Sequence, residues 1–317
     1  MEDNTDSSFE KVLGEINHDD YVSSLNRRPG IFSNSIGIKD PTKMGEEYAA
    51  QWVENGYIIL RGFYSDDECK RITEGSIDAA KKIVETGVEV RPSYFYKKGS
   101  YTVPEENFEA KVDSFENGLS KIYNLHREDV HSNDIFQKFC QNKSLNKIIS
   151  GILGDNVDCF NSQFIFKNPG ALGQPWHQDS LYYNFDRAPQ VGVWLATSKA
   201  TEENGCLFVS PGSHKEAIHY HEKDPRQSAN LGYVEICDYD FSNEIAVTMD
   251  VGDVLIFHSL LMHKSIDNSS DNRRSAMVFH FADRDTKFVG PTIDEELMRF
   301  WWVPTVRDGE VVCGLGL

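Results

Sequence analysis

Two histidines, one aspartate and one arginine stand at spacings that could build a metal centre for oxidation chemistry. His177 and Asp179 are two residues apart, so on a strand their side chains would face the same side. His263, in a second apolar segment, could supply a third ligand. Two imidazoles and one carboxylate on one face of a metal leave the opposite face open, as in non-haem Fe(II) oxygenases. The pattern therefore predicts an Fe(II) site at these three residues.

Arg274 follows His263 by eleven residues and is expected on the next inward-facing strand. A guanidinium can hold a carboxylate through two parallel hydrogen bonds. A metal triad with a carboxylate anchor is what a 2-oxoglutarate-dependent oxygenase requires. Arg273, the preceding residue, would face the opposite side of the same strand and is expected to point to solvent.

Other histidines offer alternatives. A buried, hydrogen-bonded His–Asp pair is the alternative interpretation of His177 and Asp179. His258 competes with His263 for the third position, and we expect it to be structural. His219 and His221 have a spacing that could bind a second metal, but a loop near the substrate entrance is the favoured interpretation.

Short apolar segments at regular intervals, separated by Gly, Pro and Asn, follow residue 153. The expected strands are 159–166, 176–183, 191–197, 207–209, 254–258 and 275–281. Short strands at this spacing are typical of a sandwich, a barrel or a jelly roll. We expect a mainly β protein with flanking helices and a double-stranded β-helix core, that is, a cupin-like jelly roll.

The N-terminal half is predicted to be largely helical. The expected helices are 45–55, 65–86, 114–123 and 132–153, with a short helix at 295–302 in the tail. Residues 1–44 are predicted to form an arm or lid, and 45–317 a single domain. Within that domain we expect helical support at about 45–153, a jelly-roll core at about 154–283 and a tail at 284–317.

Four sequence motifs give the chain a resemblance to a known family. They are HQD at 177–179, NGCLFVSPGSHK at 204–215, GDVLIFHSLLMH at 252–263 and GYIILRGF at 56–63. In this order, and with an arginine eleven residues after the last histidine, they resemble the phytanoyl-CoA dioxygenase family of Fe(II)/2-oxoglutarate oxygenases. The likeness runs from about Glu54 to about Ala282.

The resemblance implies Fe(II) held by the triad, with 2-oxoglutarate and O2 as co-substrates, succinate and CO2 as products, and ascorbate as a reductant in vitro. It also nominates residues that bind 2-oxoglutarate: Arg274, Ser265, Trp194 and Lys121. Because the carboxylate at 179 is retained, the resemblance argues against halogenation, which needs a small residue there. Lys264 departs from the family, which usually has glycine after the distal histidine.

Composition bears on the substrate and the compartment. The net charge of −18 argues against nucleic acid, against an anionic membrane surface and against a polyanionic acyl-CoA. Without a signal-peptide pattern or a long apolar run, and with six scattered cysteines, the sequence predicts a cytoplasmic protein. Its oligomeric state is not indicated.

The substrate is predicted to be a small carboxylated metabolite, as in specialised metabolism, which would be hydroxylated, desaturated or cyclised. The alternatives are an acyl-CoA 2-hydroxylase, as in the family's namesake, or a cupin-like metal lyase or binding protein. The candidate substrate contacts are Tyr96, Lys97, Tyr183, Phe185, Arg187 and Arg226.

Overall fold

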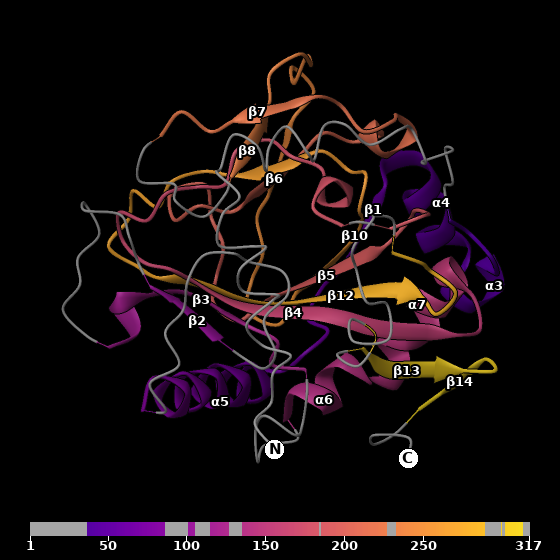
Figure 1. The fold of residues 1–317 in the computed structure, drawn as a ribbon, viewed down its shortest axis with the longest axis horizontal. Coiled ribbons are helices and arrows are strands. Elements are labelled where there is room, and N and C mark those ends of the chain that lie inside the picture. The colour runs from indigo at the N-terminus through magenta and orange to yellow at the C-terminus, as the bar shows by residue number, and fades with distance from the viewer. Residues whose placement is uncertain are drawn as a thin grey trace, which may run out of the picture.

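The computed structural model is a β structure with helices packed outside it (Figure 1). It describes residues 37–85, 101–104, 115–126, 135–183, 185–226, 233–288, 299 and 302–312. In this described part no helix is long and apolar enough to cross a membrane.

A nine-stranded antiparallel sheet forms the centre of the described structure. Its main path runs β1 (Tyr57–Leu60), β10 (Val254–His258), β5 (Val191–Ala196), β12 (Arg274–Asp283), β4 (Val157–Lys167), β13 (Val303–Arg307) and β14 (Glu310–Val311). β3 (Leu119–Tyr123) also pairs with β4, and β2 (Tyr101–Pro104) pairs with β3. The path joins strands that are far apart in sequence, which brings Arg274 and Trp194 into neighbouring strands.

Two smaller sheets lie on the side of the large sheet opposite α5 (Asp66–Glu85) and α6 (Ile135–Cys140) (Figure 1). One contains β11 (His263–Ser265), β6 (Leu207–Val209) and β9 (Ile245–Val247), and the other contains β7 (His221–Lys223) and β8 (Val234–Ile236).

Alternate residues of the large sheet face two different cores. Val193 and Leu195 of β5 join the core beneath the helices, whereas Trp194 and Ala196 join the core shared with β6 and β9. Strands buried on both faces read as continuous apolar runs, which is why the sequence alone could not assign their faces.

The helices cover the outer face of the large sheet. They comprise α3 (Pro41–Met44), α4 (Glu46–Asn55), α5, α6 and α7 (Lys143–Leu153). Ser65 and Glu68 form a capping box at the start of α5, because the Ser65 amide donates to Glu68 Oε2 (2.8 Å) and the Glu68 amide to Ser65 Oγ (3.3 Å). Residues 37–44, assigned from sequence to an arm, include α3, and the amide of Lys39 donates to the carbonyl of Gly151 in α7.

Three sequence expectations were wrong in detail. The helix expected at 114–123 is a 3₁₀ turn (Glu116–Gly118) followed by β3, because pairing with β4 overrides the local preference. The helix expected at 132–153 is divided into α6 and α7, with Asn142 capping the second. The strand expected at 176–183 is a single bridge at His177 followed by a 3₁₀ turn, Asp179–Leu181. Most of the predicted tail helix lies outside the described residues.

Candidate metal and co-substrate site

His177, Asp179 and His263 each place a ligand atom within 4.8 Å of the other two. The two histidines form an isolated antiparallel bridge, in which the His177 amide donates to the His263 carbonyl (2.9 Å) and the His263 amide donates back (3.0 Å). Asp179 begins the 3₁₀ turn and returns its carboxylate towards both rings. In the described part of the chain this is the group of residues that could hold a metal ion.

Backbone carbonyls fix the orientation of both imidazoles. Nδ1 of His177 lies 2.8 Å from the Pro175 carbonyl, and Nδ1 of His263 lies 2.9 Å from the Leu261 carbonyl. A carbonyl only accepts, so Nδ1 carries the proton and Nε2 keeps its lone pair. The two Nε2 atoms lie 3.5 and 3.7 Å from Asp179 Oδ1. Burial and the neighbouring His177 lower the pKa of His263 to about 4, so at neutral pH it is a neutral ligand.

His280, which the sequence analysis missed, holds the other oxygen of the aspartate. Its Nε2 lies 3.3 Å from Asp179 Oδ2, and its Nδ1 faces the Asn161 amide nitrogen at 3.5 Å. Burial alone would raise the pKa of Asp179, but the neighbouring His263, His177 and His280 hold it well below the usual value. The aspartate is therefore an anion with one oxygen hydrogen-bonded and the other directed at the histidines.

Arg274 lies in the same pocket as the triad and is buried. Its Nε and Nη2 donate to the carbonyl of Gly205 at 3.1 and 2.9 Å, and its guanidinium carbon lies 5.4 Å from the centre of the Trp194 ring. These bonds use one edge of the guanidinium and leave the end formed by Nη1 and Nη2 for another group.

Unpartnered polar atoms in this pocket fit a keto diacid. Among the residues that the structure describes, Arg274 Nη1 and Trp194 Nε1 are buried N–H donors without a hydrogen-bond partner, and Gln163 Oε1 is a buried acceptor without one. Buried polar groups ordinarily have partners. Two donors converging on one pocket suit a carboxylate, and the neighbouring triad suits the metal that a keto acid would chelate. The residues present therefore fit both iron and 2-oxoglutarate.

The other residues nominated for 2-oxoglutarate line the same pocket. Lys121 is buried on β3 with its ammonium group 5.1 Å from the centre of the Tyr233 ring. Ser265 lies on β11, where its hydroxyl accepts from the Gln174 amide at 3.1 Å. Lys264 bonds to Glu244 at 2.6 Å and is not among the pocket residues, so the departure from the family pattern does not alter the pocket wall.

The alternative residues have other contacts. The His258 ring accepts from the Leu260 amide at 2.9 Å and lies 5.6 Å from the Trp52 ring, outside the pocket. Arg273 donates to the Asn168 side chain at 2.8 Å and is not a pocket residue. The opposite facing of Arg273 and Arg274 was predicted from the strand; a solvent contact for Arg273 was not the outcome.

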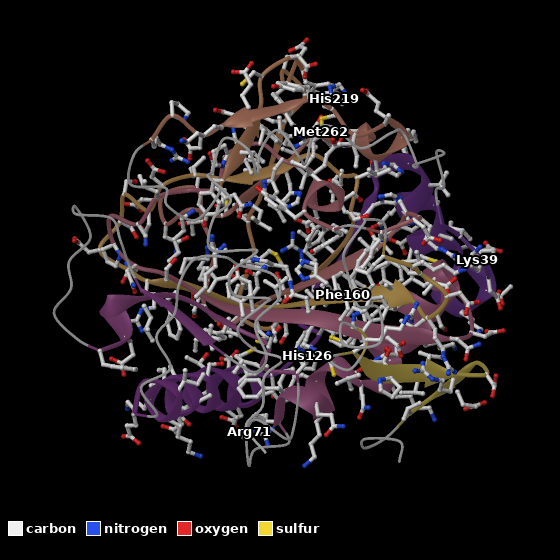
Figure 2. The ribbon with its side chains drawn as sticks, in the orientation of Figure 1. Lys39, Arg71, His126, Phe160, His219 and Met262 are labelled. Carbon is white, nitrogen blue, oxygen red and sulfur yellow. The ribbon has the colours of Figure 1, made fainter. Side chains whose placement is uncertain are left out.

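His219 and His221 lie at different distances from the triad, since His221 contacts Gln178, the residue between His177 and Asp179. His219 bonds to Glu216 (2.9 Å) and Asp238 (3.2 Å) near the outer edge of the molecule, well separated from Phe160 in Figure 2. His221 accepts from the Gln178 amide at 3.2 Å, and its other ring nitrogen faces the His219 carbonyl at 2.8 Å. Both ring nitrogens of His221 thus have hydrogen-bond partners in the backbone.

Tyr183 and Phe185 belong to an aromatic cluster next to the triad. The cluster comprises Phe160, Tyr183, Phe185, Phe288 and Trp302, with neighbouring ring centres 4.9 to 5.8 Å apart. The His280 ring lies 5.6 Å from Tyr183, so this residue links the cluster to Asp179.

The predicted basic substrate contacts are paired with carboxylates where they are described. Arg187 bonds to Asp186 at 3.0 Å, and Arg226 bonds to Asp224 at 2.7 Å and to the Gly173 carbonyl at 2.7 Å. Arg226 therefore has a structural role in this loop. Tyr96 and Lys97 lie outside the described residues.

Comparison with known proteins gives consistent results. A family model described as phytanoyl-CoA dioxygenase (PhyH) matches residues 52–276. A peroxisomal phytanoyl-CoA dioxygenase of Bos taurus is 29% identical over 244 residues, covering 74% of this chain and 68% of the relative. The peroxisomal phytanoyl-CoA dioxygenase of Homo sapiens is 26% identical over 276 residues, covering 84% and 76%.

Solved structures share the fold. The α-ketoglutarate dependent carbocyclase SnoK from nogalamycin biosynthesis superposes with a TM-score of 0.59 at 19% identity, covering 88% of this chain and 97% of its own. EctD from S. alaskensis, solved with 2-oxoglutarate and 5-hydroxyectoine, gives 0.58 at 18% identity, covering 90% and 92%. The predicted jelly-roll fold is confirmed.

Proposed function

Because the chain belongs to the phytanoyl-CoA dioxygenase family of 2-oxoglutarate-dependent non-haem iron oxygenases, we propose that it oxidises an unactivated C–H bond of a small organic molecule at the site described above. One observation carries this assignment of the site. The His177, Asp179 and His263 triad shares a pocket with the buried, unpartnered donors of Arg274 and Trp194.

Each residue is assigned a distinct task. His177 and His263 present Nε2 atoms in a fixed orientation, and Asp179 Oδ1 completes one face of the metal. Arg274 and Trp194 donate to the distal carboxylate of 2-oxoglutarate and so orient the keto-acid end towards the metal. Iron, 2-oxoglutarate and O2 together supply the oxidising power, and the protein supplies position and exclusion of side reactions.

The proposed substrate is a small carboxylated metabolite. The aromatic cluster gives an apolar wall beside Asp179, suited to the substrate's carbon skeleton. Arg187 is two residues from Phe185 in the sequence, and its side chain is 39% exposed, so it could exchange Asp186 for a substrate carboxylate. A single carboxylate needs one such group, whereas a net charge of −18 repels a polyanion at long range.

The competing proposal is hydroxylation of an acyl-CoA thioester. It is favoured by the names of the two relatives above, which are phytanoyl-CoA dioxygenases. The solved relatives include a carbocyclase and a protein holding 5-hydroxyectoine, so one scaffold accommodates ring closure as well as small substrates. Hydroxylation, desaturation and ring closure differ by about an ångström in where the substrate carbon is held. A lyase or a simple binding protein would not use Arg274 as a carboxylate anchor, which argues against that alternative.

The test is turnover with matched substrates. The Fe(II) protein is incubated with 2-oxoglutarate and ascorbate, with and without a panel of free carboxylic acids and their CoA thioesters. Succinate and oxidised product are measured by mass spectrometry, with His263→Ala as the inactive control. We expect a free acid to be oxidised with stoichiometric succinate and its thioester to be inert. Efficient oxidation of the thioester with an inert free acid would establish the competing proposal.

A further inference from the structure

Lys167 is a buried cation in the co-substrate pocket that neither the motifs nor the triad accounts for. It ends β4, and its side chain is among the pocket residues. Its ammonium group donates to the hydroxyl of Ser265 (2.9 Å) and to the carbonyl of Ile266. Both acceptors are uncharged, so these contacts provide no counter-charge.

The sheet register places Lys167 directly opposite Arg274. The two residues are Cα partners on the antiparallel strands β4 and β12, and both line the pocket. Like charges directly opposite each other on a sheet are destabilising. Burial and the Arg274 guanidinium hold the pKa of Lys167 well below its usual value. Asp267 is the acid that counters this effect, but its carboxylate is 58% exposed and is bound by the Gly173 amide (2.6 Å) and by Arg226 (3.3 Å).

Gly205 allows the two cations to be this close. Its carbonyl accepts from Arg274, while a Cβ at this position would lie 2.8 Å from Cδ and 2.9 Å from Cε of Lys167. Its φ of +87° is also one that other residues rarely adopt. Gly205 of the turn motif thus lets the side chain of Lys167 pack against the residue whose carbonyl holds Arg274.

The contacts of Ser265 fix the direction of its hydroxyl. The oxygen accepts from Lys167 Nζ at 2.9 Å and from the Gln174 amide at 3.1 Å. A hydroxyl has two acceptor positions and one donor, so its acceptor positions are used and its hydrogen is left to donate. Ser265 lines the same pocket as Arg274, and an anion there would receive that hydrogen.

We propose that Lys167 is a positioning residue for the distal carboxylate of 2-oxoglutarate, which it serves by making Ser265 an obligate hydrogen-bond donor and by adding a second positive charge opposite Arg274. The inference rests on the proposed function, since it concerns the same pocket. Loss of Lys167 should therefore weaken the binding of a keto acid that has a distal carboxylate, and leave the binding of a keto acid without one unchanged.

The experiment compares two keto acids that differ in that carboxylate. The anaerobic Fe(II) protein is titrated with 2-oxoglutarate and with 2-oxobutyrate, and the visible charge-transfer absorption of the chelate is followed. Lys167→Met should weaken 2-oxoglutarate binding about tenfold or more and leave 2-oxobutyrate within about twofold, because hydrogen bonds to charged groups are at stake. Lys264→Met is the matched control, since Lys264 lies outside the pocket, and should change neither affinity.

Ser265→Ala provides the second test and remains informative if Lys167→Met does not fold. It should also lose preference for 2-oxoglutarate, and in the double variant the two losses should be less than additive because both act through one hydroxyl. Unchanged preference in Lys167→Met, unchanged preference in Ser265→Ala, or additive losses would each overturn the proposal. A wild-type protein that gives no absorption with either keto acid would instead contradict the proposed function.

Discussion

Replacing His280 tests whether a residue that is not a metal ligand controls the metal site. Its Nε2 donates to Asp179 Oδ2 at 3.3 Å, which holds Oδ1 towards the two imidazoles. His280→Ala removes a hydrogen bond to a charged group, worth about 1.5–3 kcal/mol. Partners of metal ligands typically contribute about 10- to 100-fold in affinity. We therefore expect Fe(II) or Co(II) affinity to fall at least about tenfold.

Two further variants separate the hydrogen bond from packing. The His280 ring also contacts Tyr183 and Phe160, with ring centres 5.6 and 6.0 Å away. His280→Phe keeps a ring without the donor, and His280→Gln keeps a donor without the ring. Metal affinity, measured by competition with a chelator, should fall in the phenylalanine variant and be partly restored in the glutamine variant. Wild-type affinity in the phenylalanine variant would refute the role of the hydrogen bond.

Three further predictions concern the triad, the anchor and the pH. His263→Ala should lose metal binding and turnover while His258→Ala keeps both, and the reverse result in a metal-binding assay would exchange their roles. Arg274→Ala should weaken 2-oxoglutarate at least about tenfold in calorimetric titration, with Arg273→Ala nearly unchanged; equal losses would contradict the strand-facing argument. Burial and Arg274 depress the pKa of Lys167, and a bound carboxylate would raise it, so 2-oxoglutarate affinity should fall as the pH rises above the depressed value. Calorimetric titration at several pH values should show this fall in affinity in the wild type. If Lys167→Met shows the same fall, a group other than Lys167 is responsible for the pH dependence.

The grouping of the triad could be predicted, although part of the reasoning was wrong. The same-face argument for His177 and Asp179 assumed a strand, whereas Asp179 begins a 3₁₀ turn. The turn and the strand both return the aspartate towards the histidine, so the grouping did not depend on the local structure. What fixes the geometry is the backbone bridge between His177 and His263, a long-range contact that no local pattern contains.

Lys121 shows the opposite case. The family resemblance nominated Lys121 for the co-substrate pocket, and Lys121 does line that pocket. The sequence analysis placed Lys121 on a helix, however, whereas it lies on β3. Local propensity favoured a helix, and pairing of β3 with β4 decided the outcome. A lysine on an isolated helix is usually solvated, whereas on a strand in the middle of a sheet it is buried and must have a partner.

His280 and Lys167 were both missed, but for different reasons. His280 follows Arg274 by six residues on β12, and side chains at even spacings share a face of a strand. Once the spacing from His263 had selected Arg274, the alternation would also have placed His280 on the inward face, so this residue could have been found from sequence. Lys167 could not, because its facing becomes significant only through the register that sets it opposite Arg274. Register is a property of two strands together, and within one strand Lys167 is simply its polar last residue. For this reason Lys167, the residue that best tests how the pocket holds an anion, could be identified only from the structure.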